Sequence, residues 1–482
     1  MEPKLNDRVV PLIVAVALFM ENMDSTVIAT SLPAVARDLG EDPIALKLAL
    51  TSYLLSLAVF IPLSGWVADR FGARTVFRAA IVVFTLGSAA CGFAHSLLDF
   101  VLFRIVQGIG GAMMVPVGRL VILRTVPKAD LISALAWLTI PALLGPVIGP
   151  PLGGFITTYV SWRWIFWINI PMGILGVMLA THFIDNIREH ELPPLDVKGF
   201  ILSGIGLAGL AFGFTTIGQG LLPMSVVITL LLAGIIGCWF YVRHARNSPA
   251  PLIDLSLLKV ETFYASVVGG FIFRIGVGAT PFLLPLLLQL GFGLTPFQSG
   301  LLTFASALGA IAMKTTAAPI IRRYGFKAVL VVNALLTGVF IASTALFTPM
   351  TPHVVIFTVL VISGFFKSLQ FTSINSLAYA DIEPRAMSRA TSFASVAQQL
   401  SLSAGVAVGA LVLELRRHWR PNAAVESGDF GVAFIVIAAI SAASALTFMR
   451  MPKTAGASLS APARPMGATQ KLVTEAAARV DA

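Results

Sequence analysis

Two acidic residues, Glu21 and Asp24, lie three positions apart in the apolar stretch LFMENMDSTVIATSLP, residues 18–33. In a helix this spacing places both carboxylates on one face. Apolar surroundings favour the protonated form of a carboxylate and a nearby positive charge favours the ionised form, so that movement of a helix can switch which form is favoured. The pair therefore indicates a group that can exchange protons inside an apolar helix.

Further charged and amide side chains also lie within apolar runs. Charged groups at bilayer depth cost about 2.5–3.5 kcal/mol on insertion scales, so they usually face a cavity and have partners. Bases predominate in this set, and a cavity lined in this way would accept anionic groups. Arg119 and Lys314 could instead extend from their helix ends to water, and the amides could join neighbouring helices. The candidate cavity residues are Arg119, Arg274, Gln289, Lys314, Lys367, Gln370 and Asn375.

The composition is that of a helical membrane protein. The chain has 482 residues, of which 57% are hydrophobic and 12% charged, about half of the roughly 25% charged residues in soluble domains. Apolar runs of about 20 residues recur along the chain, and each can cross a hydrocarbon core of about 30 Å as a helix. The ten-residue alternation of barrel strands is absent. We therefore expect an all-α polytopic membrane protein.

We expect fourteen transmembrane helices in two six-helix bundles with two extra helices between them. The expected division is an N-terminal bundle over 1–184, a linker with the two extra helices over 185–261, a C-terminal bundle over 262–451 and a disordered cytoplasmic tail over 452–482. The spans are expected near 10–33, 46–68, 75–94, 99–123, 133–158, 164–184, 197–217, 223–243, 262–290, 298–319, 327–346, 353–379, 387–415 and 430–451.

The distribution of basic residues predicts the orientation. Of the 33 Lys and Arg residues, 22 lie in segments on the side of the N-terminus, 6 in the opposite loops and 5 within spans. Cytoplasmic loops carry such an excess, so both termini are expected in the cytoplasm, in a bacterial inner membrane. The net charge of +10 then needs no nucleic acid partner.

Asp24 and Arg104 lie at similar expected depths. Asp24 is about nine residues from the outer end of its span, and Arg104 is about five from the outer start of the fourth span. At 1.5 Å per residue the depths differ by about 6 Å, within side-chain reach if the spans are neighbours. We expect Asp24 to couple transport to protons with Arg104 as its partner. The alternatives are a permanent structural ion pair and, for Glu21, a substrate-site acid, a second proton carrier or a tolerated polar group.

The segment GWVADRFGARTVF, residues 65–77, has the residue types of a gating loop. Gly65 would let helices approach closely, and Gly72 would permit a tight turn. Asp69 can pair with Arg70, Arg74 or a neighbouring helix end. A weaker copy, RRYGFKAVL (322–330), matches this loop by position. It places Gly325 opposite Gly72 and Lys327 opposite Arg74, as expected of a transporter built from repeats.

Small residues recur in GPVIGPPLGG, residues 145–154, at spacings of three to four. This spacing places them on one helical face, where they allow close packing, and the prolines kink the helix. The alternative is an ordinary kinked packing helix. The residues are Gly145, Pro146, Gly149, Pro150, Gly153 and Gly154.

Several segments together resemble motifs of the major facilitator superfamily. The loop at 65–77 is similar to the superfamily's signature loop, RIVQGIGGAMMVPVGR (104–119) to its fourth-span motif and the 145–154 segment to its fifth-span antiporter motif. MDSTVIATSLP (23–33) resembles the first-span motif of its drug exporters, and SWRWIFWINIPMG (161–173) is typical of the fourteen-span drug:proton antiporters. The segments are also similar to those of the MdtD-like and HsrA-like group of multidrug exporters. Ala73 and Glu21 depart from the usual pattern, which has a base and an uncharged polar residue there.

The resemblance implies a major facilitator fold and a proton-driven antiporter that exports drugs or other small amphipathic molecules by alternating access. The alternative is an exporter of organic anions or of a specific metabolite with the same fold. The expected partners are a small-molecule substrate, protons and the lipid bilayer, with a monomeric chain and no cofactor or metal. An enzyme is not expected, because the six histidines are scattered and no nucleophile motif occurs. Cys91 and Cys238 lie in apolar runs and are expected to be free thiols.

Overall fold

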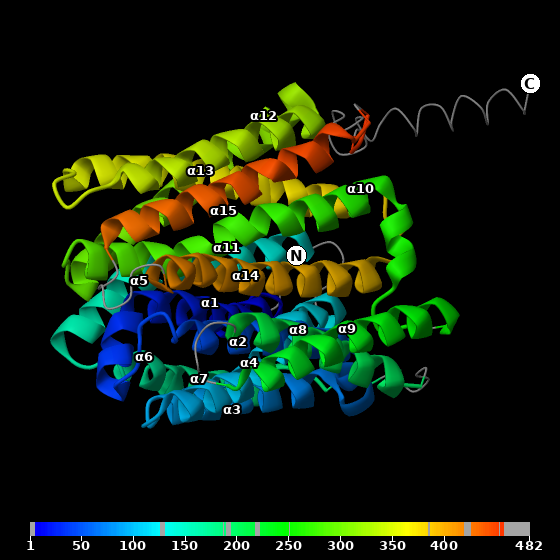
Figure 1. Ribbon diagram of the computed structural model, residues 1–482. Coiled ribbons are helices and arrows are strands. Elements are labelled where there is room, and N and C mark those ends of the chain that lie inside the picture. Colours follow the sequence, from blue (N-terminus) through cyan, green and yellow to red (C-terminus); the bar gives the residue numbers. More distant parts are fainter. Residues whose placement is uncertain are drawn as a thin grey trace, which may run out of the picture.

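The protein is a bundle of long helices (Figure 1). The computed structural model describes residues 5–125, 131–186, 188, 194–216, 222–249, 251–383, 386–418, 426–452 and 454–456, and these ranges contain helices and no strand. Thirteen helical segments among them are long and apolar enough to cross a membrane. Helix α5, with 29 residues, is a further apolar helix. The all-α polytopic fold and the fourteen predicted spans are therefore confirmed as helices.

The first six crossings form the N-terminal half. Their apolar faces share a core in which side chains of α1, α2, α3 and α4, such as Val14, Leu57, Phe77 and Met114, are buried. The sixth crossing is made by two consecutive helices, α6 and α7. The elements are α1 (Leu5–Leu39), α2 (Lys47–Phe71), α3 (Ala73–Cys91), α4 (Leu97–Thr125), α5 (Leu131–Tyr159), α6 (Trp164–Trp167) and α7 (Asn169–Phe183).

The last six crossings form the C-terminal half. Its first crossing contains two π-helical turns, η2 and η3, one on each side of α11. The elements are η1 (Leu255–Lys259), α10 (Glu261–Tyr264), η2 (Ala265–Gly269), α11 (Gly270–Leu286), η3 (Leu287–Gly291), α12 (Pro296–Ser343), η4 (Thr344–Leu346), α13 (His353–Ala378), α14 (Met387–His418) and α15 (Ser427–Met449). Most of the predicted tail, from residue 457 onward, lies outside the described residues.

Helices α8 (Val197–Thr216) and α9 (Met224–Asn247) form a hairpin between the two halves in the chain. Their contact depends on small residues. A Cβ added at Gly206 would lie 2.7 Å from Cys238 Sγ, and one added at Gly209 would lie 2.8 Å from Gly234 Cα. The backbones therefore approach as closely as small residues allow. Helix α8 also contacts α2 and α14, so the hairpin touches both halves.

Two equivalent glycines turn the chain at corresponding places in the two halves. Gly72 has φ +94° between α2 and α3, and Gly325 has φ +76° within α12. Because φ values in this range favour glycine, α12 comprises two spans joined at a turn, as the sequence predicts. After these turns Arg74 Nη1 donates to Ile184 O at 3.3 Å, and Lys327 Nζ donates to Met451 O at 2.6 Å. Each base thus binds the carbonyl end of the last helix in its half.

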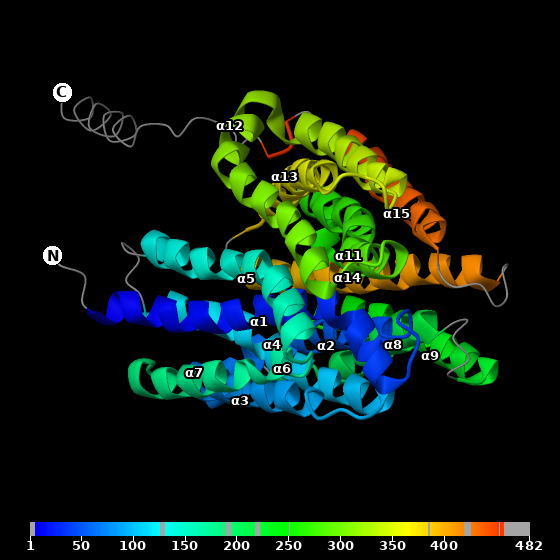
Figure 2. The ribbon, with the colours of Figure 1, turned by 90° about the vertical axis from the view of Figure 1, so that its left-hand side faces the viewer.

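The two halves meet at one end and diverge toward the other. Figure 2 shows α12 and α15 running away from α5 and α1 toward the side where α1 begins. At the opposite end α5 packs against α12, and a Cβ added at Gly154 would lie 2.8 Å from Phe297 Cα. Gln289 Nε2 also donates to Thr30 O at 2.8 Å there. We call this contacting end the closed end; it is the end that the sequence predicts to face outward.

The turn at Gly72 generates a stability prediction. An added Cβ would meet a positive φ and would lie 2.6 Å from Asn186 Cγ. We expect Gly72→Ala to destabilise the protein by about 1–3 kcal/mol, the usual range for a residue held in such a conformation. Thermal unfolding of the detergent-purified protein measures this. Gly65→Ala is the matched control in the same hairpin, because Gly65 has ordinary φ and nothing within 4 Å of its added Cβ. Equal midpoints for the two variants would contradict the prediction.

Candidate functional site

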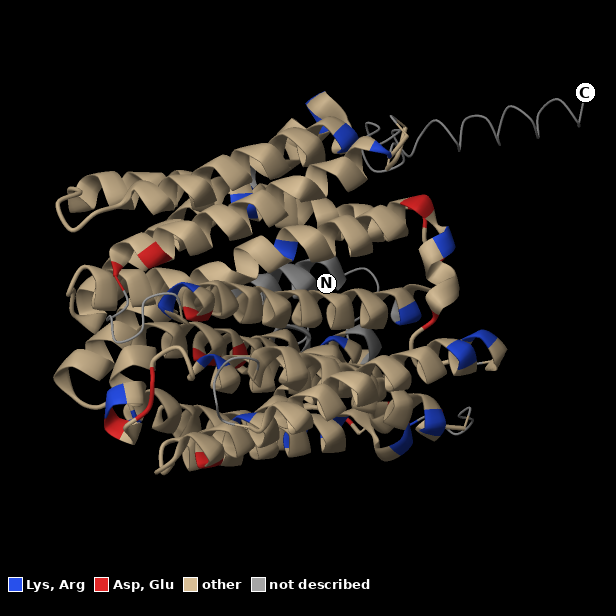
Figure 3. Cartoon of the chain, in the orientation of Figure 1, with Lys and Arg blue, Asp and Glu red and all other residues tan. Residues whose placement is uncertain are grey.

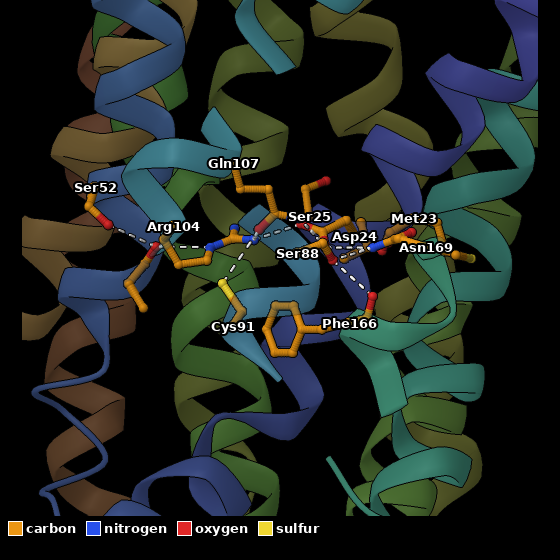
Figure 4. Close-up of polar contacts among 12 residues, drawn as sticks. Met23, Asp24, Ser25, Ser52, Ser88, Cys91, Arg104, Gln107, Phe166 and Asn169 are labelled. Carbon is orange, nitrogen blue, oxygen red and sulfur yellow. Dashed lines mark hydrogen bonds and ion pairs between the residues drawn. The ribbon is translucent and has the colours of Figure 1, made fainter. Parts of the chain in front are cut away.

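Asp24 and Arg104 contact each other in the interior of the N-terminal half (Figure 4). Arg104 Nη1 donates to Asp24 Oδ2 at 2.7 Å, and the two residues are 1% and 2% exposed, respectively. The contact joins α4 to α1. The structure therefore brings together the two residues whose expected depths match.

Three further side chains surround the pair. Gln107 Nε2 and Asn169 Nδ2 both donate to Asp24 Oδ1, at 2.8 and 3.1 Å. Asn169 Nδ2 also lies 2.9 Å from Ser88 Oγ, which itself donates to Phe166 O at 2.9 Å. Asp24 thus accepts hydrogen bonds from α4 and α7 together. We call Asp24, Arg104, Gln107, Asn169 and Ser88 the Asp24 network.

Arg104 is held by neutral groups as well as by the carboxylate. Its Nη1 donates to Gln107 Oε1 at 2.6 Å and its Nε to Ala49 O at 3.3 Å. The Tyr53 ring lies against the guanidinium, with 4.2 Å from Cζ to the ring centroid. An ionised carboxylate can only accept hydrogen bonds, whereas a protonated one must also donate. A protonated Asp24 would therefore need an acceptor for its own proton, and all three of its side-chain contacts here are donors.

Glu21 stands apart from this network. Among the described residues its Oε2 is buried and has no hydrogen-bond partner. The neighbouring Asn22 donates to Leu18 O at 2.8 Å, within its own helix. The shared helical face of Glu21 and Asp24 thus does not give them a common hydrogen-bond partner among the described residues.

The small residues of α5 pack against the stretch of α1 that carries Asp24. A Cβ added at Gly145 would lie 2.9 Å from Met23 N, and one added at Gly153 would lie 2.6 Å from Val27 O. Gly149 likewise faces Thr26 and Val27. Gly154 instead faces α12, and Pro150 O faces Gly300 of that helix. The prediction of a single helical face is therefore wrong, because these residues divide between α1 and α12.

Only part of the predicted gating loop, residues 65–77, packs against neighbouring residues. Gly72 makes the expected turn, and Asn186 Oδ1 accepts a hydrogen bond from Thr75 N at 3.2 Å beside it. Asp69 is half-buried and Arg70 is exposed. Gly65 is exposed and its added Cβ would meet nothing within 4 Å. The expectation that Gly65 brings helices close is therefore wrong here, because none of the described residues packs on that side.

The predicted cavity residues separate into two groups. Gln289 binds Thr30 O at the closed end. Gln370 donates to Leu330 O at 3.1 Å and accepts from Asn333 at 2.9 Å, fully buried. Both amides therefore join helices and do not line a cavity. The second group consists of the four basic residues and Asn375. Arg119 and Lys314 are exposed, Lys367 is half-buried, and Arg274 is buried beside Asn375.

Two ion pairs join the halves at the closed end. Lys47 Nζ, at the start of α2, lies 2.8 Å from Glu414 Oε1 of α14, and the Lys47 side chain is fully buried. Asp42 in the preceding loop pairs with Arg417. Both contacts cross from the N-terminal to the C-terminal half. They close this end electrostatically as well as by packing.

The sequence-based prediction missed several of these residues. Gln107 and Asn169 lie inside the segments 104–119 and 161–173, and their buried amides in apolar runs are the signal that could have marked them. Lys47 and Glu414 lie at predicted span ends, where charges ordinarily meet water. Because their pairing depends on how the halves pack, no local signal could have found it.

Comparisons with known proteins extend over most of the chain. The sequence matches the profile of the Major Facilitator Superfamily over residues 14–242 and 266–478. It is 37% identical over 446 residues to "Putative multidrug resistance protein MdtD" of Citrobacter koseri, covering 91% of this chain and 94% of that protein. A protein of the same name from Yersinia enterocolitica is 37% identical over 453 residues, covering 93% and 96%.

Solved structures share the fold at low sequence identity. A D-xylose-proton symporter superposes with a TM-score of 0.68 at 15% identity, covering 93% of this chain and 98% of that one. The POT family transporter PepTSo has a TM-score of 0.67 at 14% identity, covering 92% and 97%. These likenesses confirm the predicted arrangement of helices.

The ion pairs at the closed end generate a conformational prediction. Lys47→Met removes the partner of Glu414 and should open this end more often, about tenfold for each 1.4 kcal/mol of lost pairing. The readout is the rate at which a membrane-impermeant maleimide labels Ser299→Cys, since Ser299 is fully buried at the start of α12. Cys91 and Cys238 are first replaced by alanine.

Arg163→Gln is the matched control for this measurement. Arg163 Nη1 lies 2.5 Å from Asp38 Oδ2, so this ion pair lies at the same end but within the N-terminal half. Its loss should leave labelling unchanged. Equal labelling rates in all three proteins would show that the Lys47–Glu414 pair does not hold the halves together.

Proposed function

The chain belongs to the major facilitator superfamily and is a multi-pass inner membrane transporter, and on this premise we propose that it is a proton-coupled antiporter. It exports drugs or other small amphipathic molecules by alternating access. Curated relatives that match over more than nine-tenths of the chain carry the name multidrug resistance protein, which supports this class of cargo. The predicted family is confirmed, and the protein is not an enzyme.

The Asp24 network carries the proton-coupling proposal. Asp24 accepts three hydrogen bonds from Arg104, Gln107 and Asn169, on two other helices. These contacts are all donors, and the Arg104 guanidinium supplies a counter-charge for the carboxylate. Withdrawal of α1 from these donors would leave a buried carboxylate without compensation, and such a group takes up a proton. Movement of α1 would thereby couple protonation to conformation.

The packing of α5 against α1 supports such movement. Gly145, Gly149 and Gly153 present no side chains toward residues 22–30 of α1. Glycine contacts of this kind leave few side chains between the two helices, and the hydrogen bond between Ser31 and Thr157 is one that a shift of α1 along α5 would have to break. Gly154 and Gly300 repeat this arrangement between α5 and α12, where the two halves meet. The antiporter-motif residues would thus form the sliding surfaces of the transport cycle.

The two halves are proposed to rock as bundles over 1–184 and 262–451, with 185–261 as linker. Basic residues support the orientation with both termini inside: Figure 3 shows most Lys and Arg at the right-hand end of the bundle. The closed end is then extracellular and the structure represents an inward-facing state. Asp69, Arg70 and Arg74 lie at the inner end of α2 and α3, where they would latch the halves when that end closes.

The cycle follows from these assignments. In the inward-facing state the substrate enters while Asp24 is ionised and bound to Arg104. Opening of the outer end breaks the Lys47–Glu414 and Asp42–Arg417 pairs and admits a proton to Asp24. The substrate leaves outward, and return to the inward-facing state releases the proton to the cytoplasm. Protons thus move inward as substrate molecules move outward.

Transport in proteoliposomes with an imposed pH gradient tests the proposal. We expect wild-type protein to drive uphill movement of ethidium or a similar amphipathic dye. Asp24→Asn should lower this uphill movement to the level of protein-free liposomes, because the amide cannot exchange a proton. Exchange of labelled for unlabelled dye without a gradient should persist, since alternating access itself does not need the proton.

Glu21→Gln is the matched control, because it removes a neighbouring carboxylate that lies outside the Asp24 network. Uphill transport that survives in Glu21→Gln and is lost in Asp24→Asn would assign coupling to Asp24. Full uphill transport by Asp24→Asn would refute that assignment. The converse pattern would move the coupling role to Glu21.

A further inference from the structure

Three basic residues lie on α13 or against it in the C-terminal half: Lys367 belongs to α13, and Arg274 and Lys314 contact its last turns. Arg274 Nη2, from α11, donates to Asn375 Oδ1 at 3.0 Å, and its Cζ lies 5.3 Å from the centroid of the Phe371 ring. Lys314 Nζ, from α12, donates to Thr372 Oγ1 at 3.1 Å. Lys367 lies one turn before Phe371 on α13, a spacing that places the two on one face. We call Arg274, Lys314 and Lys367 the α13 basic cluster.

The charge of this cluster is not balanced by the protein. Within the part of the chain that the structure describes, no carboxylate pairs with any of its three members. Arg274 is only 4% exposed, and its Nε is buried without a hydrogen-bond partner. Its observed partners are an amide oxygen and an aromatic ring, both neutral. A buried guanidinium without a counter-charge is unfavourable, which points to a counter-charge that arrives with a ligand.

The geometry of Arg274 indicates which anion would fit. A guanidinium binds a carboxylate side-on through Nε and one terminal nitrogen. Asn375 already holds Nη2 in place, and the adjacent Nε is unoccupied. Apolar side chains complete the surroundings, including Phe371 and Ile374, whose Cγ2 packs near Gly270. An anionic group attached to an apolar body matches this combination.

The three basic residues differ in how exposed their side chains are. Lys314 is exposed, Lys367 is half-buried and Arg274 is buried. Lys314 lies well beyond Pro296 and Gly300, where α12 contacts α5, on the part of α12 that diverges from α5 in Figure 2. An anion entering between the halves would therefore meet Lys314 first. It would reach Arg274 when the Phe371 ring moves aside.

We propose that the α13 basic cluster binds the carboxylate of an amphipathic organic anion and that such anions are a substrate class of this transporter. This inference rests on the proposed export function for its physiological meaning, but the binding site itself does not depend on proton coupling. The acidic Asp24 network and the basic cluster then lie in opposite halves. The N-terminal half would handle the proton and the C-terminal half would hold the anion.

Direct binding to the detergent-purified full-length protein tests the proposal without transport. The probes are 11-(dansylamino)undecanoic acid and its uncharged primary amide, which share one apolar body, measured by dansyl fluorescence at pH 7. We expect the acid to bind wild-type protein at least tenfold more tightly than the amide. Arg274→Gln and Lys367→Met should each weaken binding of the acid about tenfold, the usual effect of losing one charge-assisted contact, and leave binding of the amide unchanged.

Arg243→Gln is the charge-matched control, because Arg243 lies near the end of α9, far along the chain from the cluster, against Trp239. It should bind both probes as wild type does. Arg274→Lys should restore part of the affinity, since it returns the charge without the planar edge. If Arg274→Gln fails to fold, Lys367→Met carries the test, because its side chain is only half-buried.

Equal affinity of wild type for acid and amide, no binding of the acid, or equal loss of both probes in the variants would overturn the proposal. The export proposal is tested by a different measurement and can fail independently of the anion site. If the dye assay shows no proton-driven export while the acid binds through Arg274 and Lys367, the anion site stands and the export function falls. If export stands while acid and amide bind alike, only the anion site falls.

Discussion

A charged pair inside a membrane must find all its hydrogen-bond partners within the protein, because the hydrocarbon region supplies no water. Asp24 and Arg104 meet this constraint with groups from α1, α2, α4 and α7. Asn169 then reaches α3 through Ser88. Five helices of the N-terminal half are thus positioned by one buried ion pair, and none of them can shift alone without leaving a polar atom unpaired.

The C-terminal half is organised differently at the same depth. Gln370 and Asn333 bind each other and backbone carbonyls, so its central polar contacts are neutral. Its charges instead gather on Arg274, Lys314 and Lys367. The N-terminal half therefore pairs Asp24 with Arg104, whereas Arg274, Lys314 and Lys367 have no acidic partner among the described residues. Related halves with the same helix order have acquired different chemistry.

Much of the fold was predictable because membrane helices must be long and apolar. Gly72 and Gly325 were also recognisable, since a short basic loop between two spans demands a turn that glycine supplies. The Asp24–Arg104 contact was predictable because the depth of a residue in the membrane follows from its distance along the chain from the end of its span. Residue type indicates that a position can pack closely but not which neighbour lies there. The surroundings of Gly65 and Gln289, and the division of the α5 glycines between α1 and α12, could therefore not be predicted. The pairing of Lys47 with Glu414 depends on two segments far apart in the chain and on the conformational state.

The contacts of Arg74 and Lys327 have a mechanical consequence. Arg74 ties the turn after α2 to the end of α7, and Lys327 ties the turn within α12 to the segment after α15. The rim opposite the closed end is therefore cross-braced in each half. A braced rim transmits force with little internal bending. The bending that accompanies movement of the halves must then occur in the segments between them. There the α8–α9 hairpin contacts both α2 and α14. The α8–α9 hairpin would then bend when the two halves move relative to each other. Its resistance to bending would affect how fast the halves interconvert between their two arrangements.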